Sequence, residues 1–153
     1  MISVRLLGPG DEAVLALLNA EDADFDLEGR GGPGRPLAAA DAAAYLADPT
    51  VRHLVAEEDG RVIGFNLCYV LRRRNDAARE VLLFEIGVRQ GARRAGRAMV
   101  AAMRDFMERE AIEEAWVLAD NPGAIAFYAA CGFVVDEEQG TQMLLTLPSA
   151  GSH

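Results

Sequence analysis

The stretch from residue 84 to residue 110 constrains this chain more than any other, because a strand there leads directly into a basic turn and a helix. Residues 84–88 are typical of a buried strand, residues 93–98 combine arginines with small residues, and an apolar stripe at helical spacing follows. Such a turn directs several backbone N–H groups at one place, and the N-terminus of the helix adds partial positive charge there. The pattern therefore predicts a phosphate-binding turn at residues 93–98.

Two common phosphate-binding motifs do not fit this turn. A Walker loop needs a Gly-Lys-Ser/Thr run, and none follows. A Rossmann fingerprint needs glycines spaced Gly-x-Gly-x-x-Gly, and this turn has neither that spacing nor a place in the first strand–helix unit. The turn belongs to another kind of phosphate site.

Composition bounds the domain organisation and the partners. A chain of 153 residues suits one domain, which we expect to span residues 1–148, with a disordered tail at residues 149–153. The net charge of −9 argues against nucleic acid as the main partner. It favours a cationic substrate, although an acidic surface can also serve solubility alone.

The sequence has no feature that predicts a membrane segment or a metal site. No apolar run approaches the roughly 18 residues that span a bilayer, and the N-terminus does not resemble a signal peptide. Cys68 and Cys131 are expected as buried free thiols, as in a reducing, cytoplasmic compartment. No spacing of cysteine and histidine indicates a metal centre.

Periodicity predicts an α/β chain of alternating elements. Strands are expected at residues 3–7, 51–57, 61–71, 80–88 and 116–119, with a final hairpin of residues 133–136 and 142–147; helices are expected around residues 14–18, 38–48, 96–110 and 122–131. The strand, helix and strand between residues 80 and 119 should form a right-handed unit with parallel strands. Residues 81–84 are apolar at consecutive positions, which predicts a strand buried on both faces.

Residues 21–36 differ in character from the rest. They are acidic first and then rich in glycine and proline, which predicts a mobile loop or lid. The acidic half either contacts a cationic ligand or is merely solvated.

Two polar residues in apolar surroundings are candidates for chemistry. Glu85 interrupts an apolar strand, and burial of a carboxylate raises its pKa toward the range useful for a general base. The alternative is a structural ion pair with a nearby arginine. Tyr128 lies on a predicted helix that Asn121 caps, and its phenol could protonate a leaving group. The alternative is a core aromatic residue with a satisfied hydroxyl.

Two segments resemble the signatures of the GCN5-related N-acetyltransferase (GNAT) superfamily. Residues 93–98 resemble its Gln/Arg-x-x-Gly-x-Gly/Ala pyrophosphate motif, with Ala98 in place of the second glycine. Residues 121–133 resemble the helix that lies beside the coenzyme thiol. The resemblance covers the chain from residue 3 to residue 147. It implies the GNAT fold: a mixed, mostly antiparallel sheet whose one parallel strand pair splays at the coenzyme site, flanked by about four helices.

The resemblance also implies a co-substrate, acetyl-CoA, and no metal. The pantetheine arm would bond the backbone of Ile86, Gly87 and Val88, and Asn121 matches a polar residue that contacts the coenzyme. In the family the amine attacks the thioester directly in a ternary complex, and Tyr128 matches the tyrosine that protonates the departing thiolate. Homodimers are frequent among its members, so a homodimer is expected. The pyrophosphate would lie on the backbone of Arg93, Arg94, Ala95, Gly96, Arg97 and Ala98.

Within the superfamily, residues 45–48, 61–64, 69–71 and 79–88 look like those of the type I aminoglycoside 3-N-acetyltransferases. Glu80 and Glu85 match the two acidic positions of that group, with Glu85 in place of an aspartate. Leu82 and Phe84 replace its tyrosines.

That narrower resemblance implies a cationic small-molecule acceptor. It would be an aminoglycoside acetylated on a primary amine, at the 3-N position. Glu80, Glu85 and Asp120 would bind it, and Glu85 would take the proton of the amine directly or through water. Two alternatives stay open: an enzyme for another small amine or for a protein or peptide amine, and a catalytically silent acyl-CoA sensor.

Overall fold

The computed structural model describes residues 1–25, 36–138 and 140–148. Contacts divide the chain into two compact units, residues 1–120 and residues 121–153. The described elements of the first unit are β1 (Ser3–Leu6), α1 (Glu12–Ala20), the short 3-10 helix η1 (Asp22–Asp24), α2 (Ala39–Ala47), β2 (Val51–Glu58), β3 (Arg61–Arg72), β4 (Arg79–Val88), α3 (Arg94–Arg109) and β5 (Glu114–Val117). The second unit contains α4 (Pro122–Ala130).

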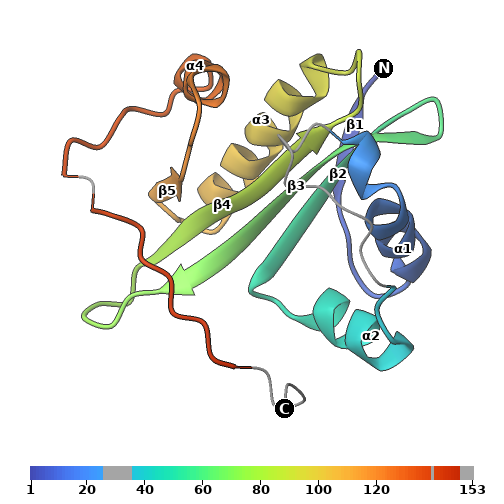
Figure 1. Cartoon of the computed structure of the whole chain (residues 1–153), viewed down its shortest axis with the longest axis horizontal. Coiled ribbons are helices and arrows are strands. Elements are labelled where there is room, and N and C mark those ends of the chain that lie inside the picture. The colour runs from blue at the N-terminus through green and yellow to red at the C-terminus, as the bar shows by residue number, and fades with distance from the viewer. Residues whose placement is uncertain (26–35, 139, 149–153) are drawn as a thin grey trace. The chain divides into compact units, whose positions relative to one another are not determined.

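The five strands form one sheet in the order β1-β2-β3-β4-β5. The first three pairings are antiparallel, whereas β4 and β5 are parallel and α3 connects them (Figure 1). This arrangement confirms the predicted mixed sheet and its parallel strand pair. Among the described residues, no helix combines the length and the apolar character needed to cross a membrane.

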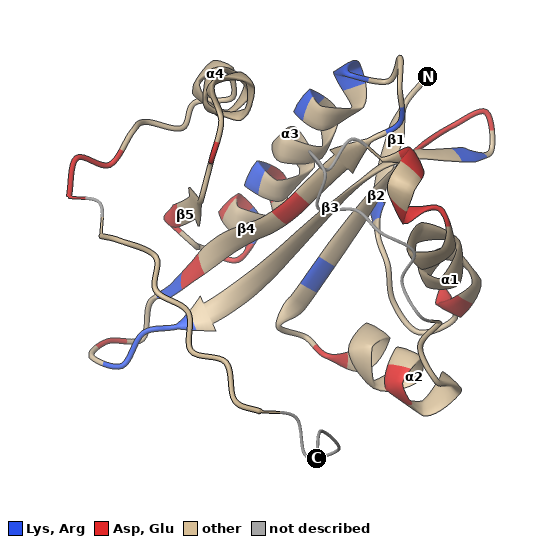
Figure 2. Ribbon diagram, in the orientation of Figure 1, with Lys and Arg blue, Asp and Glu red and all other residues tan. Residues whose placement is uncertain are grey.

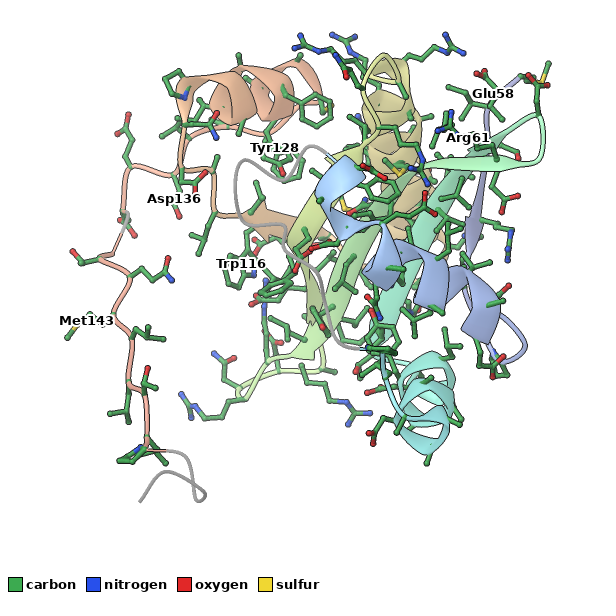
Figure 3. All side chains as sticks on the ribbon, turned by 45° about the vertical axis from the view of Figure 1, so that its right-hand side comes forward. Glu58, Arg61, Trp116, Tyr128, Asp136 and Met143 are labelled. Carbon is green, nitrogen blue, oxygen red and sulfur yellow. The ribbon has the colours of Figure 1, made fainter. Side chains whose placement is uncertain are left out.

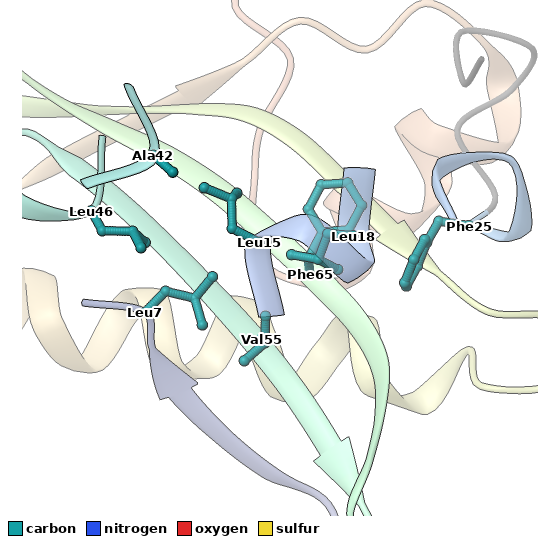
Figure 4. Packing of buried hydrophobic residues seen from close by; sticks show 8 residues of the cluster. All are labelled: Leu7, Leu15, Leu18, Phe25, Ala42, Leu46, Val55 and Phe65. Atoms are coloured by element: carbon teal, nitrogen blue, oxygen red, sulfur yellow. The ribbon is translucent and has the colours of Figure 1, made fainter. Parts of the chain in front are cut away.

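Helices cover both faces of the sheet, and each face has its own core. On one face α1 and α2 pack through leucines onto Val55 and Phe65 (Figure 4). Phe25 meets Phe65 edge-on at 5.3 Å between ring centroids. These apolar contacts fix α1 and α2 over the β1–β3 half of that face, because burial of apolar surface is the main driving force for packing.

On the opposite face α3 packs close to the strands. Ala95 and Met99 are fully buried there, against Ile63 and Ala56. The approach depends on Gly64: a Cβ atom at that position would lie 2.9 Å from the Met99 Cε atom and 3.1 Å from the Gly87 carbonyl oxygen. Only a residue without a side chain allows this spacing.

A bulge in β4 corrects one prediction. Leu67 of β3 pairs with Glu85 while the next residue, Cys68, pairs with Leu83, so Phe84 is an extra residue in β4. Phe84 is 52% exposed. The prediction that residues 81–84 are buried on both faces is therefore wrong at this position, because the bulge turns the Phe84 side chain out of the core.

Other predicted boundaries shift by a few residues. The final strand of the sheet, β5, lies two residues before the predicted 116–119, and α3 begins at Arg94 rather than near Gly96. Such shifts at element ends are ordinary. Most of the predicted loop at residues 21–36, namely residues 26–35, lies outside the described residues, as does the predicted tail at residues 149–153.

The predicted C-terminal hairpin is wrong for the described residues, since neither 133–136 nor 142–147 forms a strand. A two-stranded hairpin is marginal unless one face packs on a core. Here the apolar side chains of the segment are largely exposed, from 62% at Val135 to 90% at Val134, with 89% at Met143. Without that packing, the two predicted strands have no core that would hold them together.

Candidate active site

The predicted phosphate-binding turn is a series of tight turns that becomes α3. The Ala92 N–H donates to the Arg89 carbonyl at 3.0 Å, the Ala95 N–H to the Ala92 carbonyl at 3.0 Å, and the Gly96 N–H to the Arg93 carbonyl at 3.1 Å. Gly91 has a φ of 83°, which glycine adopts without strain. Residues 94–98 are thus the first turn of the helix, and the N–H groups of Ala95 and Gly96 are already bonded to carbonyls of the preceding turn. Phosphate binding there stays a prediction.

The side chains of this turn divide into buried small residues and exposed arginines. Ala95 and Gly96 are buried against the sheet, whereas Arg93, Arg94 and Arg97 are exposed. Arginines continue along α3, so basic groups follow the helix (Figure 2). The Arg94 guanidinium binds the Glu58 carboxylate at 2.5 Å. Glu58 and Arg61 flank the tip of the β2–β3 hairpin (Figure 3), so that hairpin braces the start of α3.

Arg89, which the sequence analysis did not single out, anchors the end of β4. It is 8% exposed, and its Nε donates to the Val62 carbonyl at 2.7 Å. Its guanidinium lies 4.6 Å from the Phe25 ring centroid and 3.3 Å from the Glu21 carboxylate, with Asp24 at 3.9 Å. Part of the acidic segment at residues 21–28 is therefore paired within the fold. An arginine one residue after a strand has no sequence signal that marks it as buried.

The edge of β4 beyond the β5 ladder presents backbone groups. The parallel ladder runs from Glu80–Glu114 to Leu83–Val117 and ends there. Residues 85–88 continue past it, paired with β3 on the other side. The pairing of β4 with β5 therefore ends before Ile86 to Val88, the residues predicted to contact the pantetheine arm.

The β4 bulge determines which way two carboxylates point. Glu80 and Glu85 are five positions apart, and in a regular strand they would point to opposite faces. Glu80 pairs with Leu71 and Glu85 with Leu67, and these two leucines share a face because they are four residues apart in β3. The extra residue offsets the odd spacing of the two carboxylates. Both therefore lie on the same face of the sheet, the face that α1 and α2 cover at its other end.

Aromatic side chains surround these carboxylates. Tyr69 and Phe84 meet edge-on at 5.7 Å between ring centroids. Trp116 (Figure 3) pairs with Leu82 and is 39% exposed. Its indole N–H donates to the Glu80 carboxylate at 3.3 Å. We refer to this surface, made of Tyr69, Glu80, Phe84, Glu85 and Trp116, as the open sheet face. It combines negative charge with flat apolar rings, which suits a cationic ligand with apolar ring faces.

A half-buried tyrosine, Tyr45, and a buried histidine, His53, form a pair beside the open sheet face. The Tyr45 hydroxyl and the His53 Nδ1 are 2.8 Å apart, and His53 is 6% exposed. Burial lowers the pKa of His53 to about 4, so the ring is neutral at pH 7. Burial, followed by the charges of Tyr69 and Glu85, raises the pKa of Tyr45, and burial followed by Glu85 and Asp48 raises that of Tyr69. Both phenols therefore stay protonated. Nothing in the spacing of these residues along the chain indicates the contact between Tyr45 and His53.

In the second unit, the predicted capping of α4 is confirmed. The Asn121 side-chain oxygen accepts from the Ala124 N–H at 2.8 Å. Tyr128 is 8% exposed and meets Phe127 and Phe133 edge-on, at 5.3 Å and 5.4 Å between centroids. The aromatic cluster holds the Tyr128 ring within this unit. The proposed roles of Tyr128, of Asn121 toward coenzyme, and of the exposed Asp120 toward substrate stay predictions.

Cys68 is a buried free thiol, as predicted, whereas Cys131 is only partly buried. Burial raises the pKa of Cys68 to about 12, so this thiol is not a nucleophile at neutral pH. Within the described part of the chain, no group of three or more His, Cys, Asp or Glu side chains is placed to hold a metal ion.

Solved structures share this fold over almost the whole chain. An aminoglycoside acetyltransferase from an uncultured soil metagenomic sample aligns with a TM-score of 0.83 at 21% identity, covering 95% of this chain and 99% of that one. Another from such a sample, in complex with sisomicin, aligns with a TM-score of 0.78 at 19% identity, covering 96% and 97%. A ribosomal-protein-alanine N-acetyltransferase from Brucella melitensis biovar Abortus 2308 aligns with a TM-score of 0.69 at 19% identity, covering 94% and 100%.

A search of the curated proteins found no match. The family comparison is specific, because residues 16–133 match the Acetyltransferase (GNAT) family, and that span includes the strand-to-helix turn, β4 and the capped helix α4. The fold, the two signature segments and this match agree, and the chain belongs to the GNAT acetyltransferase family.

Proposed function

We propose that this protein transfers an acetyl group from acetyl-CoA to a primary amine of an aminoglycoside, at the 3-N position. Members of the GNAT family use acetyl-CoA. The observation that carries the choice of acceptor is the bulge in β4, which brings Glu80 and Glu85 to one face together with Phe84 and Trp116. Two carboxylates beside aromatic rings suit an acceptor with several ammonium groups on sugar-like rings.

The turn and the β4 edge fit the shape of the donor. The first turn of α3 exposes Arg93, Arg94 and Arg97, and both their charge and the helix dipole favour a bound pyrophosphate. The unladdered edge of residues 86–88 offers backbone groups to the pantetheine amides. Acetyl-CoA bound there would supply the activated thioester.

In the proposed reaction, two side chains transfer protons. Glu85 takes the proton of the attacking amine, directly or through water, and Tyr128 donates a proton to the sulfur of the leaving thiol. Glu80, held by the Trp116 indole, and Asp120 bind further ammonium groups. The net charge of −9 adds long-range attraction for such a cation. The buried free thiol of Cys68 suits a reducing, cytoplasmic compartment. A homodimer stays part of the proposal on the resemblance alone.

The proposal is tested by following release of free CoA thiol with sisomicin, spermidine and an alanine-terminated peptide as acceptors. Turnover of sisomicin, with the acetyl group placed at the 3-N amine by NMR, is expected. Turnover of only the polyamine or the peptide would overturn the aminoglycoside assignment. Stabilisation by acetyl-CoA without turnover of any amine would instead support the sensor alternative.

Three variants assign the roles. Glu85→Gln and Tyr128→Phe should each slow turnover by roughly 10²–10⁴-fold, the usual effect of losing a general base or acid, with little change in the Kd of acetyl-CoA. Glu80→Gln should raise the KM of the acceptor by about tenfold, because it removes one charge-assisted hydrogen bond. Glu113→Gln is the matched control, since Glu113 is exposed and lies outside the open sheet face. An unchanged rate in Glu85→Gln would remove Glu85 as the base.

A further inference from the structure

The Tyr45–His53 pair is polar and lies at least half-buried in the fold, and the proposed acetyl transfer gives it no role. His53 lies on β2 and packs edge-on between Tyr45, at 5.9 Å, and Phe65, at 5.5 Å between ring centroids. Its Nδ1 is 2.8 Å from the Tyr45 hydroxyl, while its Nε2 is buried and has no hydrogen-bond partner among the described residues. A buried polar atom that lacks a partner is costly, so a purely apolar side chain would serve packing better.

The unpartnered nitrogen indicates which atom carries the proton. A neutral imidazole has one N–H, on either Nδ1 or Nε2. A buried N–H without an acceptor is rarer in proteins than an acceptor without a donor. The favoured tautomer therefore leaves Nε2 bare and protonates Nδ1, which then donates to the Tyr45 oxygen.

This tautomer aims the Tyr45 hydroxyl proton away from His53. The charged and titratable groups that act on Tyr45 are Tyr69 and Glu85 of the open sheet face. His53 pairs with Leu67, and Leu67 pairs with Glu85, so the three residues lie in line across β2, β3 and β4. The half-buried Tyr45 phenol, held at His53, thus keeps its own O–H for a ligand bound near Glu85. A ligand oxygen beside that amine would complete its hydrogen bonding.

We propose that Tyr45, positioned by His53, binds a hydroxyl group adjacent to the reacting amine, and thereby selects vicinal amino alcohols over plain amines. The inference rests on the open sheet face being the acceptor site. Tyr45 would touch the substrate, whereas His53 acts through Tyr45 and is a positioning residue.

A matched pair of acceptors tests this selectivity. trans-2-Aminocyclohexanol and cyclohexylamine differ only in the neighbouring hydroxyl, and kcat/KM is measured for both with a fixed concentration of acetyl-CoA. The wild-type enzyme should prefer the amino alcohol by about 3–10-fold, the usual worth of one neutral hydrogen bond. Tyr45→Phe should bring the ratio of the two kcat/KM values close to one, while the KM of acetyl-CoA stays unchanged. An equal loss for both acceptors, or no preference in the wild type, would overturn the proposal.

Variants of His53 separate positioning from packing. His53→Leu should lose the preference as Tyr45→Phe does, and the double variant should lose no more than either one. His53→Asn keeps an N–H near the Nδ1 position and should retain most of the preference. ¹⁵N NMR of labelled histidine should show a neutral ring protonated on Nδ1; protonation on Nε2 would contradict the hydrogen-bond direction on which the proposal depends.

The outcome is distinguishable from failure of the proposed function. If the preference depends on Tyr45 but sisomicin is not turned over, the aminoglycoside assignment fails and the inference stands. If sisomicin is turned over but the amino alcohol is not preferred, the inference fails and the assignment stands. If no amine is turned over, both are wrong.

Discussion

Substitution of Gly64 by alanine is expected to weaken both the fold and coenzyme binding. The added Cβ would lie 2.9 Å from Met99 Cε, 3.1 Å from the Gly87 carbonyl oxygen and 3.3 Å from Val88 Cγ1. The end of the Met99 side chain can move, but the Gly87 carbonyl belongs to the β3–β4 ladder and cannot move without shifting β4. The clash therefore acts on the strand whose edge is proposed to bind the pantetheine arm.

The magnitude follows from two opposing terms. Overpacking a close contact costs about 1–3 kcal/mol, whereas alanine in place of glycine regains about 0.4–1 kcal/mol by restricting the unfolded chain. The net loss in free energy of unfolding should be about 1–2 kcal/mol, because the Gly64 backbone is outside the left-handed region and adds no strain. For a chain of this length the Tm should fall by roughly 2–8 °C.

Urea unfolding and a titration of acetyl-CoA provide the assay. Gly64→Ala should lower the unfolding midpoint and raise the Kd of acetyl-CoA. Gly8→Ala is the matched control, since a Cβ there meets nothing within 4 Å, and both quantities should stay unchanged or improve. The double variant with Met99→Leu should recover only part of the stability, because the carbonyl contact remains. If Gly64→Ala behaves like the control, the close packing of α3 and β4 is not as tight as these distances require.

Three further expectations concern the cap, the buried histidine and the hairpin brace. Asn121→Ala should destabilise the protein by about 1 kcal/mol through loss of the cap, whereas Asn121→Ser should keep the cap. If the Kd of acetyl-CoA rises in the serine variant, Asn121 contacts the coenzyme in addition to capping the helix. An unchanged Kd would refute that contact. His53 has a pKa of about 4 in the fold and binds a proton near pH 6.5 when the chain is unfolded. The neutral ring therefore costs no stability above pH 6.5. The free energy of unfolding should fall by up to about 3 kcal/mol as the pH drops from 6.5 to 4. Urea midpoints across that range should fall less steeply for His53→Asn, and parallel curves would contradict the assignment. Glu58→Gln should reduce stability by less than about 1 kcal/mol, because the pair with Arg94 is exposed, and added salt should shrink the difference between variant and wild type.

Much of the fold was predictable because its elements carry strong local patterns. The strands of the sheet alternate or run apolar, the stripe on α3 has helical spacing, and Asn121 followed by proline marks a helix start. The C-terminal hairpin was not predictable in the same way. Residues 142–147 favour a strand locally, but a strand also needs a partner and a packed face, and the described segment has its apolar side chains exposed.

Residues of the candidate site were predictable where they belong to motifs of fixed spacing. They were not predictable where the three-dimensional fold determines which side chains lie together. Glu85 is predicted from its place in an apolar strand and Glu80 from a resemblance. Their shared face depends on the extra residue Phe84, and no sequence pattern marks a bulge in an apolar run. The pair formed by Tyr45 and His53 joins α2 to β2, which pack through tertiary contacts, and spacing along the chain does not predict which side chains meet.

The two halves of the proposed site differ in what holds the ligand, and this bears on how the enzyme can change during evolution. The donor would be bound largely by main-chain groups of residues 86–88 and 94–98, which every substitution that preserves the backbone also preserves. The acceptor would be bound by side chains on the open sheet face, where Phe84 and Trp116 are exposed and contribute little to the core. Substitutions there can exchange one amine for another without loss of coenzyme or fold. The bulge in β4 thus separates a part of the strand that must be kept from a part that is free to vary.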